Sequence, residues 1–314
     1  MGTFLARRLL QMLLQVFVAA TVIFFLVRLV PGNPAVAVLG DNATEDQIQR
    51  ITAQMGLDKP VWDQYLTYLG NVVRGDLGVS LISGRDVATD IRLRIGNTLE
   101  LAIISVLISL IVGMPLGILA ALRANRAPDV VISSSAALGL ALPSFVVGTV
   151  LILIFGLKLG WLPQSRFVEF RDDPVQHIKQ IILPVATLSA SAIAVVMRMT
   201  RSSMLEVVRQ DYIRTARAKG LIEKTVVLRH ALRNAINPVV SIIGLELAAL
   251  LGGTVIVETI FNWPGLSSLL MSGVRSRDYP VIQGVVLLIC VLTILINLLV
   301  DIAYGLLDPL IRYE

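Results

Sequence analysis

Six long apolar segments divide this sequence and limit its fold more than any other feature. They run from about Leu9 to Val30, Thr98 to Leu122, Val130 to Phe155, Ile181 to Met197, Pro238 to Val257 and Val281 to Leu307. A helix needs about 20 mainly apolar residues to cross the hydrocarbon core of a bilayer. Only 16% of the 314 residues are charged, against roughly 25% in soluble domains. We therefore predict an all-α, polytopic membrane protein with six transmembrane helices.

Basic residues gather in alternate connections between these segments. Arg7 and Arg8 precede the first segment, Arg123 and Arg126 follow the second, and Arg312 lies in the tail. The connection after the fourth segment holds eight Lys and Arg residues against three acids. Because short cytoplasmic loops are enriched in Lys and Arg, we expect both termini to be cytoplasmic.

Two connections are too long to be simple turns, and they suggest a division of the chain. The predicted parts are a cytoplasmic N-terminus with the first transmembrane helix (1–30), an extracytoplasmic subdomain (31–97), and a five-helix core (98–314) with a cytoplasmic loop at about 200–234. We expect the first helix to be retained, because its apolar stretch is longer than that of a signal peptide.

An apolar stripe marks a helix within the predicted outer subdomain. Trp62, Tyr65, Leu66 and Leu69 recur at helical spacing, so we expect the stripe to pack on neighbouring residues. The subdomain would either dock another protein or cap the outer face of the helix bundle.

The long basic connection contains a short predicted helix. It begins near Asp211 and ends before Gly220, which supplies the left-handed conformation that often follows a helix end. One interpretation is an anchor that reaches toward lipid headgroups. The other is a protruding helix that fits a socket on a cytoplasmic protein.

Ionisable residues within the apolar segments are candidates for function, because their burial in lipid is costly. Glu246 lies deepest and could face a translocation pathway or a partner subunit, but a structural ion pair or a protonated, hydrogen-bonded carboxyl fits equally well. Glu100 and Arg198 lie near segment ends and are expected to reach the interface. A proton-coupled secondary transporter would need a relay of such groups, which the sequence does not offer.

Several kinds of chemistry have no motif here. Cys290 is the only cysteine, and His177 and His230 are too few and too far apart for a metal site. No Gly-x-x-x-x-Gly-Lys-Ser/Thr loop is present to hold nucleotide phosphates. We therefore expect no catalytic residues, no metal and no cofactor in this chain, and no nucleic-acid partner.

Motifs along the whole chain resemble one family of transporters. The segment from Asp211 to Leu221, followed by His230–Ala235 and Pro238, is similar to the cytoplasmic "EAA" loop of ABC importer permeases. Further matches are Arg28–Pro34, Gly56–Pro60, Gly75–Ser80, Thr98–Ala102, Gly160–Pro163, Glu258–Leu266 and Arg277–Pro280. Together they resemble the B-type transmembrane subunit of the dipeptide/oligopeptide/nickel permeases. The glutamate and first alanine of the general "EAA" signature are replaced by Arg214 and Thr215.

The resemblance implies a type I ABC importer permease fold that forms half of a translocation pathway in the bacterial inner (plasma) membrane. It implies import of short peptides; nickel chelates or glutathione-like solutes are the alternative. It also implies a second homologous permease subunit, two cytoplasmic subunits that bind ATP and Mg and hydrolyse the ATP, and an extracytoplasmic solute-binding protein. The residues expected to couple the permease to the ATPase are Asp211, Tyr212, Arg214, Thr215, Ala216, Arg217, Ala218, Lys219 and Gly220.

Overall fold

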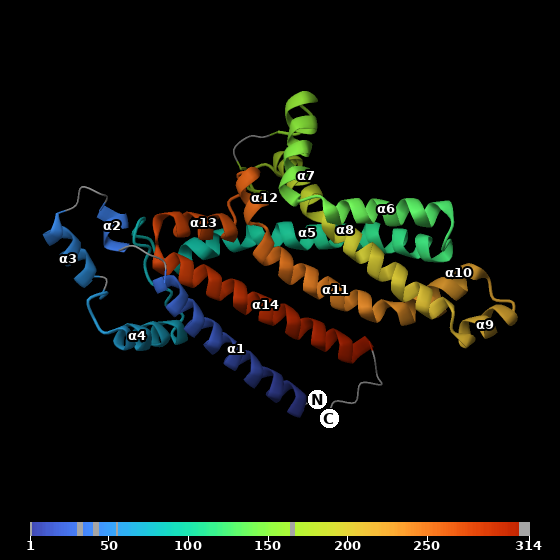
Figure 1. Ribbon diagram of the computed structural model, residues 1–314, viewed down its shortest axis with the longest axis horizontal. Helices are drawn as coiled ribbons and strands as arrows, with labels where there is room; N and C mark the ends of the chain where they lie inside the picture. Colours follow the sequence, from blue (N-terminus) through green and yellow to red (C-terminus); the bar gives the residue numbers. More distant parts are fainter. Residues whose placement is uncertain (1, 30–33, 40–43, 55, 164–166, 308–314) are drawn as a thin grey trace. The chain divides into compact units, whose positions relative to one another are not determined.

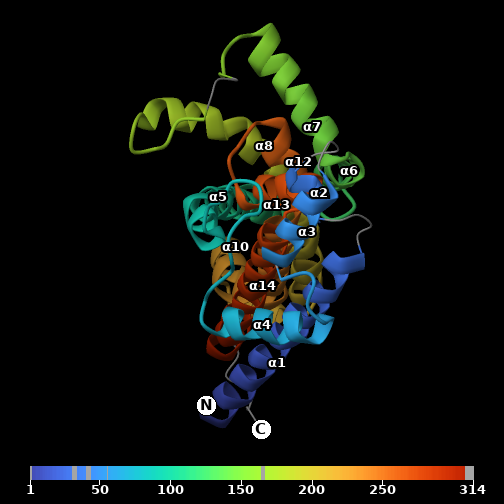
Figure 2. The ribbon, with the colours of Figure 1, turned by 90° about the vertical axis from the view of Figure 1, so that its left-hand side faces the viewer.

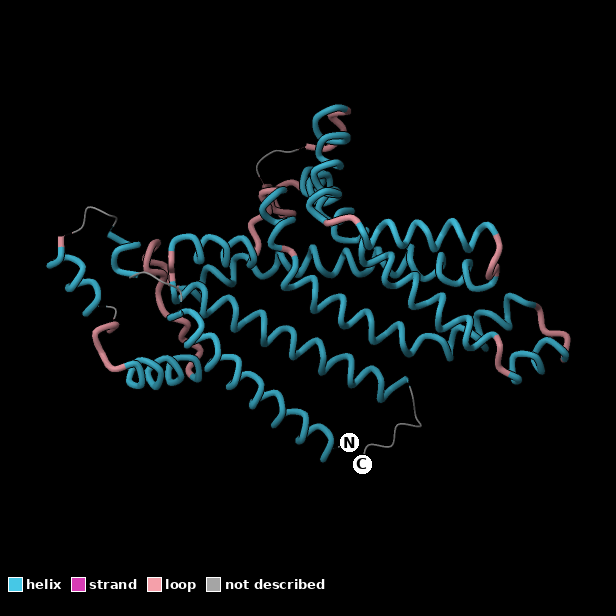
Figure 3. The backbone as a smooth tube through the Cα atoms, in the orientation of Figure 1, coloured by secondary structure: helices cyan, strands magenta, loops and turns pink. Residues whose placement is uncertain are grey.

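The described part of the computed structural model is almost entirely helical (Figure 3). The structure describes all residues except 1, 30–33, 40–43, 55, 164–166 and 308–314. Within the described part there is no strand, and the only β-type pairing is a single bridge between Val79 and Asp86. Arg312, and residues 30–33 of the Arg28–Pro34 motif, lie outside the described residues.

The helices follow one another as labelled in Figure 1. The first half contains α1 (Gly2–Leu29), α2 (Pro34–Leu39), α3 (Glu45–Gln54), α4 (Val61–Val73), α5 (Val87–Leu122), α6 (Ala127–Ala141), α7 (Ser144–Leu151) and the π-helical η1 (Ile152–Lys158). The second half contains α8 (Pro174–Val208), α9 (Asp211–Ala218), α10 (Glu223–Thr225), the π-helical η2 (Val226–Ala231), α11 (Leu232–Gly253), α12 (Val255–Ile260), α13 (Leu266–Ser276) and α14 (Tyr279–Leu307).

The chain divides into two compact units. The N-terminal unit consists mainly of the chain up to Thr98 together with Pro264–Leu295, and the central unit comprises Leu99–Trp263 together with Ile296–Arg312. Helix α5 begins at Val87, well before the expected segment start at Thr98, so the outer subdomain and the second apolar segment share one continuous helix.

The apolar segments confirm a polytopic membrane protein. Among the described residues, five helices are long and apolar enough to cross a bilayer, and a sixth span is present if α6 and the α7–η1 segment count as one. That third span was expected to be one helix, but it is bent by 99° between its two halves (Figure 2). The bend lies at Leu142 and Pro143, where Leu142 is extended (φ −83°, ψ 122°) because a residue before proline is disfavoured in the helical region.

The N-terminal unit packs α4 against α1 and α14. Tyr65 is buried, and Leu69 packs on the cluster formed by α1 and α14. The prediction holds for only part of the stripe, because Leu66 is 64% exposed and Trp62, which contacts the rings of Phe25 and Tyr65, is still 67% exposed. The buried face of α4 is rotated toward Tyr68, so the helix buries only part of the apolar stripe.

Helix α8 is the centre of the central unit, where α6, α7, α11 and α12 pack on it. Helix α5 also approaches α8 closely through Gly113 and Gly117. A methyl group on Gly117 would lie 2.6 Å from the carbonyl oxygen of Met197. Small residues spaced four apart let membrane helices pack with their backbones close together.

Candidate functional site

Helix α9 forms the candidate site in the basic connection. It covers Asp211–Ala218, with Gln210 before its first turn and Lys219 at its end. Gly220 follows with φ +79°, a conformation that costs glycine little and other residues more. The predicted helix and its glycine stop are therefore both present.

One face of α9 is fastened to its own chain. Ile213 is fully buried and Ala216 is 8% exposed, in a cluster that includes Met204 of α8 and Val226 of η2. Two residues three positions apart lie on the same side of a helix, so this pair fixes which side of α9 faces the unit. Ala216 thus contacts the chain itself.

Polar contacts tie the loop together around this helix. Two of the three guanidinium nitrogens of Arg217 donate to the Glu223 carboxylate, from Nη2 at 2.8 Å and from Nε at 3.1 Å. Hydrogen bonding to this carboxylate raises the pKa of Arg217. The hydroxyl of Tyr212 accepts a hydrogen bond from Asn234 of α11 at 2.8 Å. Side chains on both sides of the turn at Gly220 therefore hold α9 in place.

The opposite face of α9 is open and carries most of the remaining site residues. Arg214 is largely exposed, and its only ion pair within the described residues is with Asp211 of the preceding turn, at 3.2 Å. The other exposed members are Tyr212, Thr215, Ala218, Lys219 and Gly220. The α9 region thus has three parts: the buried Ile213 and Ala216, Arg217 with its ion pair to Glu223, and the exposed residues of the opposite face.

Glu246 lies in the middle of α11 and is partly buried. It makes no hydrogen bond or ion pair to any other described residue, so the structure offers no partner for the ion pair that its sequence position allowed. Ala249, Gly252 and Gly253 follow on α11 with open surface, and a methyl group on either glycine would meet nothing within 4 Å.

Glu100 was expected to reach the interface by itself, but it is bonded to a histidine. Its Oε1 lies 2.9 Å from Nε2 of His177, whose Nδ1 lies 2.8 Å from the carbonyl oxygen of Val168. The imidazole is 2% exposed and packs edge-on against Phe167 and Trp263. Sequence reasoning missed this contact because the two residues are 77 positions apart.

An ion pair between α6 and α8, of which only the carboxylate is buried, was also missed. Asp129 receives two hydrogen bonds from Arg201, at 2.6 and 2.8 Å, and further ones from the backbone of Asn125 and the hydroxyl of Ser133. Asp129 is 3% exposed. The sequence gives no signal that Asp129 pairs with Arg201, because the two residues are 72 positions apart.

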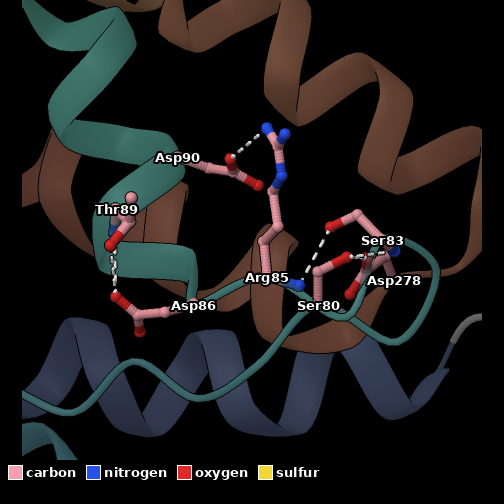
Figure 4. A network of polar contacts seen from close by, with 7 residues as sticks. All are labelled: Ser80, Ser83, Arg85, Asp86, Thr89, Asp90 and Asp278. Atoms are coloured by element: carbon pink, nitrogen blue, oxygen red, sulfur yellow. Dashed lines mark hydrogen bonds and ion pairs between the residues drawn. The ribbon is translucent and has the colours of Figure 1, made fainter.

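Two of the family-like motifs meet in the N-terminal unit, in the network of Figure 4. The hydroxyl of Ser80, from Gly75–Ser80, donates to the Asp278 carboxylate of Arg277–Pro280 at 2.5 Å. The backbone N–H of Leu81 donates to the same carboxylate at 3.2 Å, and Asp278 is 2% exposed. These motif residues therefore hold two distant parts of the chain together.

Comparisons with known proteins agree with these features. The family model described as binding-protein-dependent transport system inner membrane component matches residues 113–313, and the model of the N-terminal part of such membrane components matches residues 1–102. The glutathione transport system permease protein GsiC of Escherichia coli (strain K12) is 44% identical over 314 residues, which is 100% of both chains. GsiC of Shigella boydii is 43% identical over the same length.

Solved structures support the fold. The MetNI methionine ABC transporter in an inward-facing conformation matches with a TM-score of 0.58 and 18% identity, over 69% of this chain and 96% of that chain. A structure of an amino acid ABC transporter with histidines matches with a TM-score of 0.54 and 17% identity, over 69% of this chain and 94% of that one. The predicted type I ABC importer permease fold is confirmed. The chain belongs to the family of binding-protein-dependent transport system inner membrane components, and it is a permease subunit of an ABC importer.

Proposed function

We propose that this permease forms half of an ATP-driven import pathway and that α9 transmits movement from an ATPase subunit. The pathway is completed by a second homologous permease subunit. Two cytoplasmic subunits bind ATP and Mg and hydrolyse the ATP, and an extracytoplasmic protein delivers the solute. The permease itself performs no covalent chemistry.

The observation that carries this proposal is the two-sided character of α9. A helix can transmit a movement of the ATPase subunit to the permease only if it is firmly packed against the rest of the permease. Ile213 and Ala216 provide that attachment, while Arg214, Thr215 and Ala218 remain open to a partner. A lipid anchor would need basic residues but no such rigid attachment.

For the transported solute we propose short peptides, with glutathione, itself a tripeptide, as the first to test. The support is the 44% identity to permeases named for glutathione transport, over the full length of both chains. Nickel chelates are the alternative cargo.

The proposed topology places both termini and α9 in the cytoplasm and the subdomain after α1 outside, in a bacterial inner membrane. Cysteine labelling tests it, after the native cysteine is removed by Cys290→Ala. An impermeant maleimide added to intact cells should label Lys219→Cys only after permeabilisation. Labelling of that variant in sealed cells would refute the topology.

Uptake by the complete importer in proteoliposomes tests the energy source and the role of α9. Uptake of glutathione or dipeptides should require ATP and stop with vanadate, while an uncoupler should have no effect. The opposite pattern would indicate the proton-coupled alternative.

The matched variants are Ala218→Trp and Ala127→Trp, both at exposed alanines. Ala218→Trp places a bulky ring on the open face of α9 and should strongly reduce uptake and solute-stimulated ATP hydrolysis without changing the amount of permease in the membrane. Ala127→Trp, at the start of α6, should retain both activities. Normal uptake with Ala218→Trp would contradict the coupling role.

Glu246 is proposed to face the pathway or the second permease subunit, because it has no partner within the described chain and lies beside open small residues. Glu246→Gln should leave the stability of the isolated permease unchanged but alter uptake or subunit assembly. An equal loss of stability in the isolated chain would instead indicate a structural role.

A further inference from the structure

A cavity of about 380 Å³ lies within the N-terminal unit, and neither α9 nor Glu246 lines it. Its walls come from α1, α4 and the start of α14, together with residues of the 53–59 and 76–81 segments. Pockets that bind small molecules typically occupy about 300–1,000 Å³. The size of the cavity therefore fits a small ligand.

The strongest feature of the wall is Arg28 at the end of α1. Its Nη1 donates to the carbonyl oxygen of Phe24 at 3.0 Å, and its Nη2 donates to Oε1 of Gln64 at 2.6 Å. The guanidinium also lies over the Phe24 ring, 3.5 Å from the centroid. A guanidinium has five N–H donors, so donors remain after these two bonds.

Gln64 holds this arginine in a fixed position. While its Oε1 accepts from Arg28, its Nε2 donates to the carbonyl oxygens of Lys59 at 2.8 Å and Leu57 at 3.3 Å. The amide therefore cannot turn without losing these bonds. A cation whose orientation is fixed in advance binds a ligand with less loss of conformational freedom.

Tyr68 also lines the cavity, but its hydroxyl is not on the cavity surface. The hydroxyl is buried, and no described residue forms a hydrogen bond with it. The charged donors that the wall offers therefore come from Arg28 and Lys59.

The charges around the cavity favour an anion. Among the described residues, its lining includes Arg28 and Lys59 and a single acid, Asp76. The Asp76 carboxylate already accepts a hydrogen bond from the backbone N–H of Gly78 at 2.8 Å. The lining thus has spare donors and an excess of positive charge.

We propose that this cavity is a binding site for the oxyanion of a small molecule, held by Arg28. A carboxylate or phosphate offers the several acceptor sites that a guanidinium requires. The oxyanion has two possible sources: the carboxylate of a free solute or the phosphate of a lipid headgroup. The site is independent of the solute proposed for transport.

Protection of a reporter cysteine tests this site in the complete importer. Thr67→Cys, in a Cys290→Ala background, places a thiol on the exposed part of the cavity lining. The importer is kept in dodecyl maltoside, a detergent without an oxyanion, and the rate of maleimide labelling of the permease subunit is measured. The probes are alanyl-alanine, its C-terminal amide and phosphatidylglycerol.

Alanyl-alanine should slow labelling at least fivefold at saturation, whereas the amide should not. If phosphatidylglycerol slows labelling and alanyl-alanine does not, the site is supported and lipid phosphate is its source. If none of the probes slows labelling, the proposal is overturned.

Arg28→Gln and Arg74→Gln form a matched pair. Arg28→Gln removes the guanidinium from the cavity wall, so it should weaken the protecting probe about tenfold. Arg74, at the end of α4, is exposed and outside the cavity lining, so Arg74→Gln should leave protection unchanged. Equal protection in wild type and Arg28→Gln would also overturn the proposal.

Discussion

The close approach of α5 and α8 makes a sharp prediction for Gly117→Ala. The added methyl group would lie 2.6 Å from the Met197 carbonyl oxygen and 2.7 Å from Cβ of Thr200, whereas ordinary contacts begin near 3.4 Å. The first of these atoms belongs to the backbone and the second is bonded to it, so neither can move aside by a side-chain rotation. The helices would have to separate by nearly an ångström.

The expected magnitude follows from two opposing terms. Overpacking of this kind costs about 1–3 kcal/mol, while replacing a helical glycine by alanine gains about 0.5–1 kcal/mol. Gly117→Ala should therefore lower the free energy of unfolding by about 0–2.5 kcal/mol.

Gly96→Ala is the matched control, because Gly96 lies on the same helix and its methyl group would meet nothing within 4 Å. This variant should stabilise the protein by about 0.5–1 kcal/mol. Unfolding of the detergent-solubilised permease by titration with sodium dodecyl sulfate measures both. If Gly117→Ala were as stable as Gly96→Ala, the packing of α5 on α8 described above would be refuted.

Three further predictions concern other parts of the chain. Asp129→Asn should cost about 1.5–3 kcal/mol, because it removes the carboxylate that Arg201 bonds, while the Arg201 side chain is 29% exposed and keeps contact with solvent; an unfolding midpoint equal to that of wild type would contradict this. Ile213→Ala should loosen α9 by about 2–4 kcal/mol, seen as faster hydrogen exchange at 211–218 with normal membrane insertion, and unchanged exchange would count against the attachment. Hydrogen bonding from Thr89 holds the pKa of Asp86 below its ordinary value of 3.8, so its stabilisation of the start of α5 is complete above that value and is lost as the pH falls through the lowered pKa. Asp86→Asn should abolish this pH dependence of hydrogen exchange in the first turn, and identical profiles would show that another group is responsible.

The sequence alone was sufficient for features that depend on local composition. The bilayer requires long apolar helices, so hydropathy located the apolar spans. Their bounds were less exact, because α5, α8 and the helix that ends at Gly253 begin earlier than predicted, α8 also ends later, and the third span is bent. The end of α9 was also predictable, since the conformation at Gly220 is a property of the local backbone. The family followed from motifs distributed over the whole chain.

Tertiary structure decided which residues face one another. Pro115 and Pro184 remain inside continuous helices, whereas Pro143 lies at a 99° bend. The sequence does not show which of the three prolines bends its helix. Whether a helix bends depends on whether surrounding helices compensate for the hydrogen bond that proline removes.

The same limit applies to the sites. Helical periodicity shows that Ile213 and Ala216 share a face, but it does not reveal that this face packs on the chain itself. Nor does it bring Ser80 to Asp278, which is 198 residues away. Composition and spacing fix what a segment can form, since those properties are local. Which distant residues contact one another is decided only when the segments pack, because the free energy of a buried contact depends on both of the surfaces that form it.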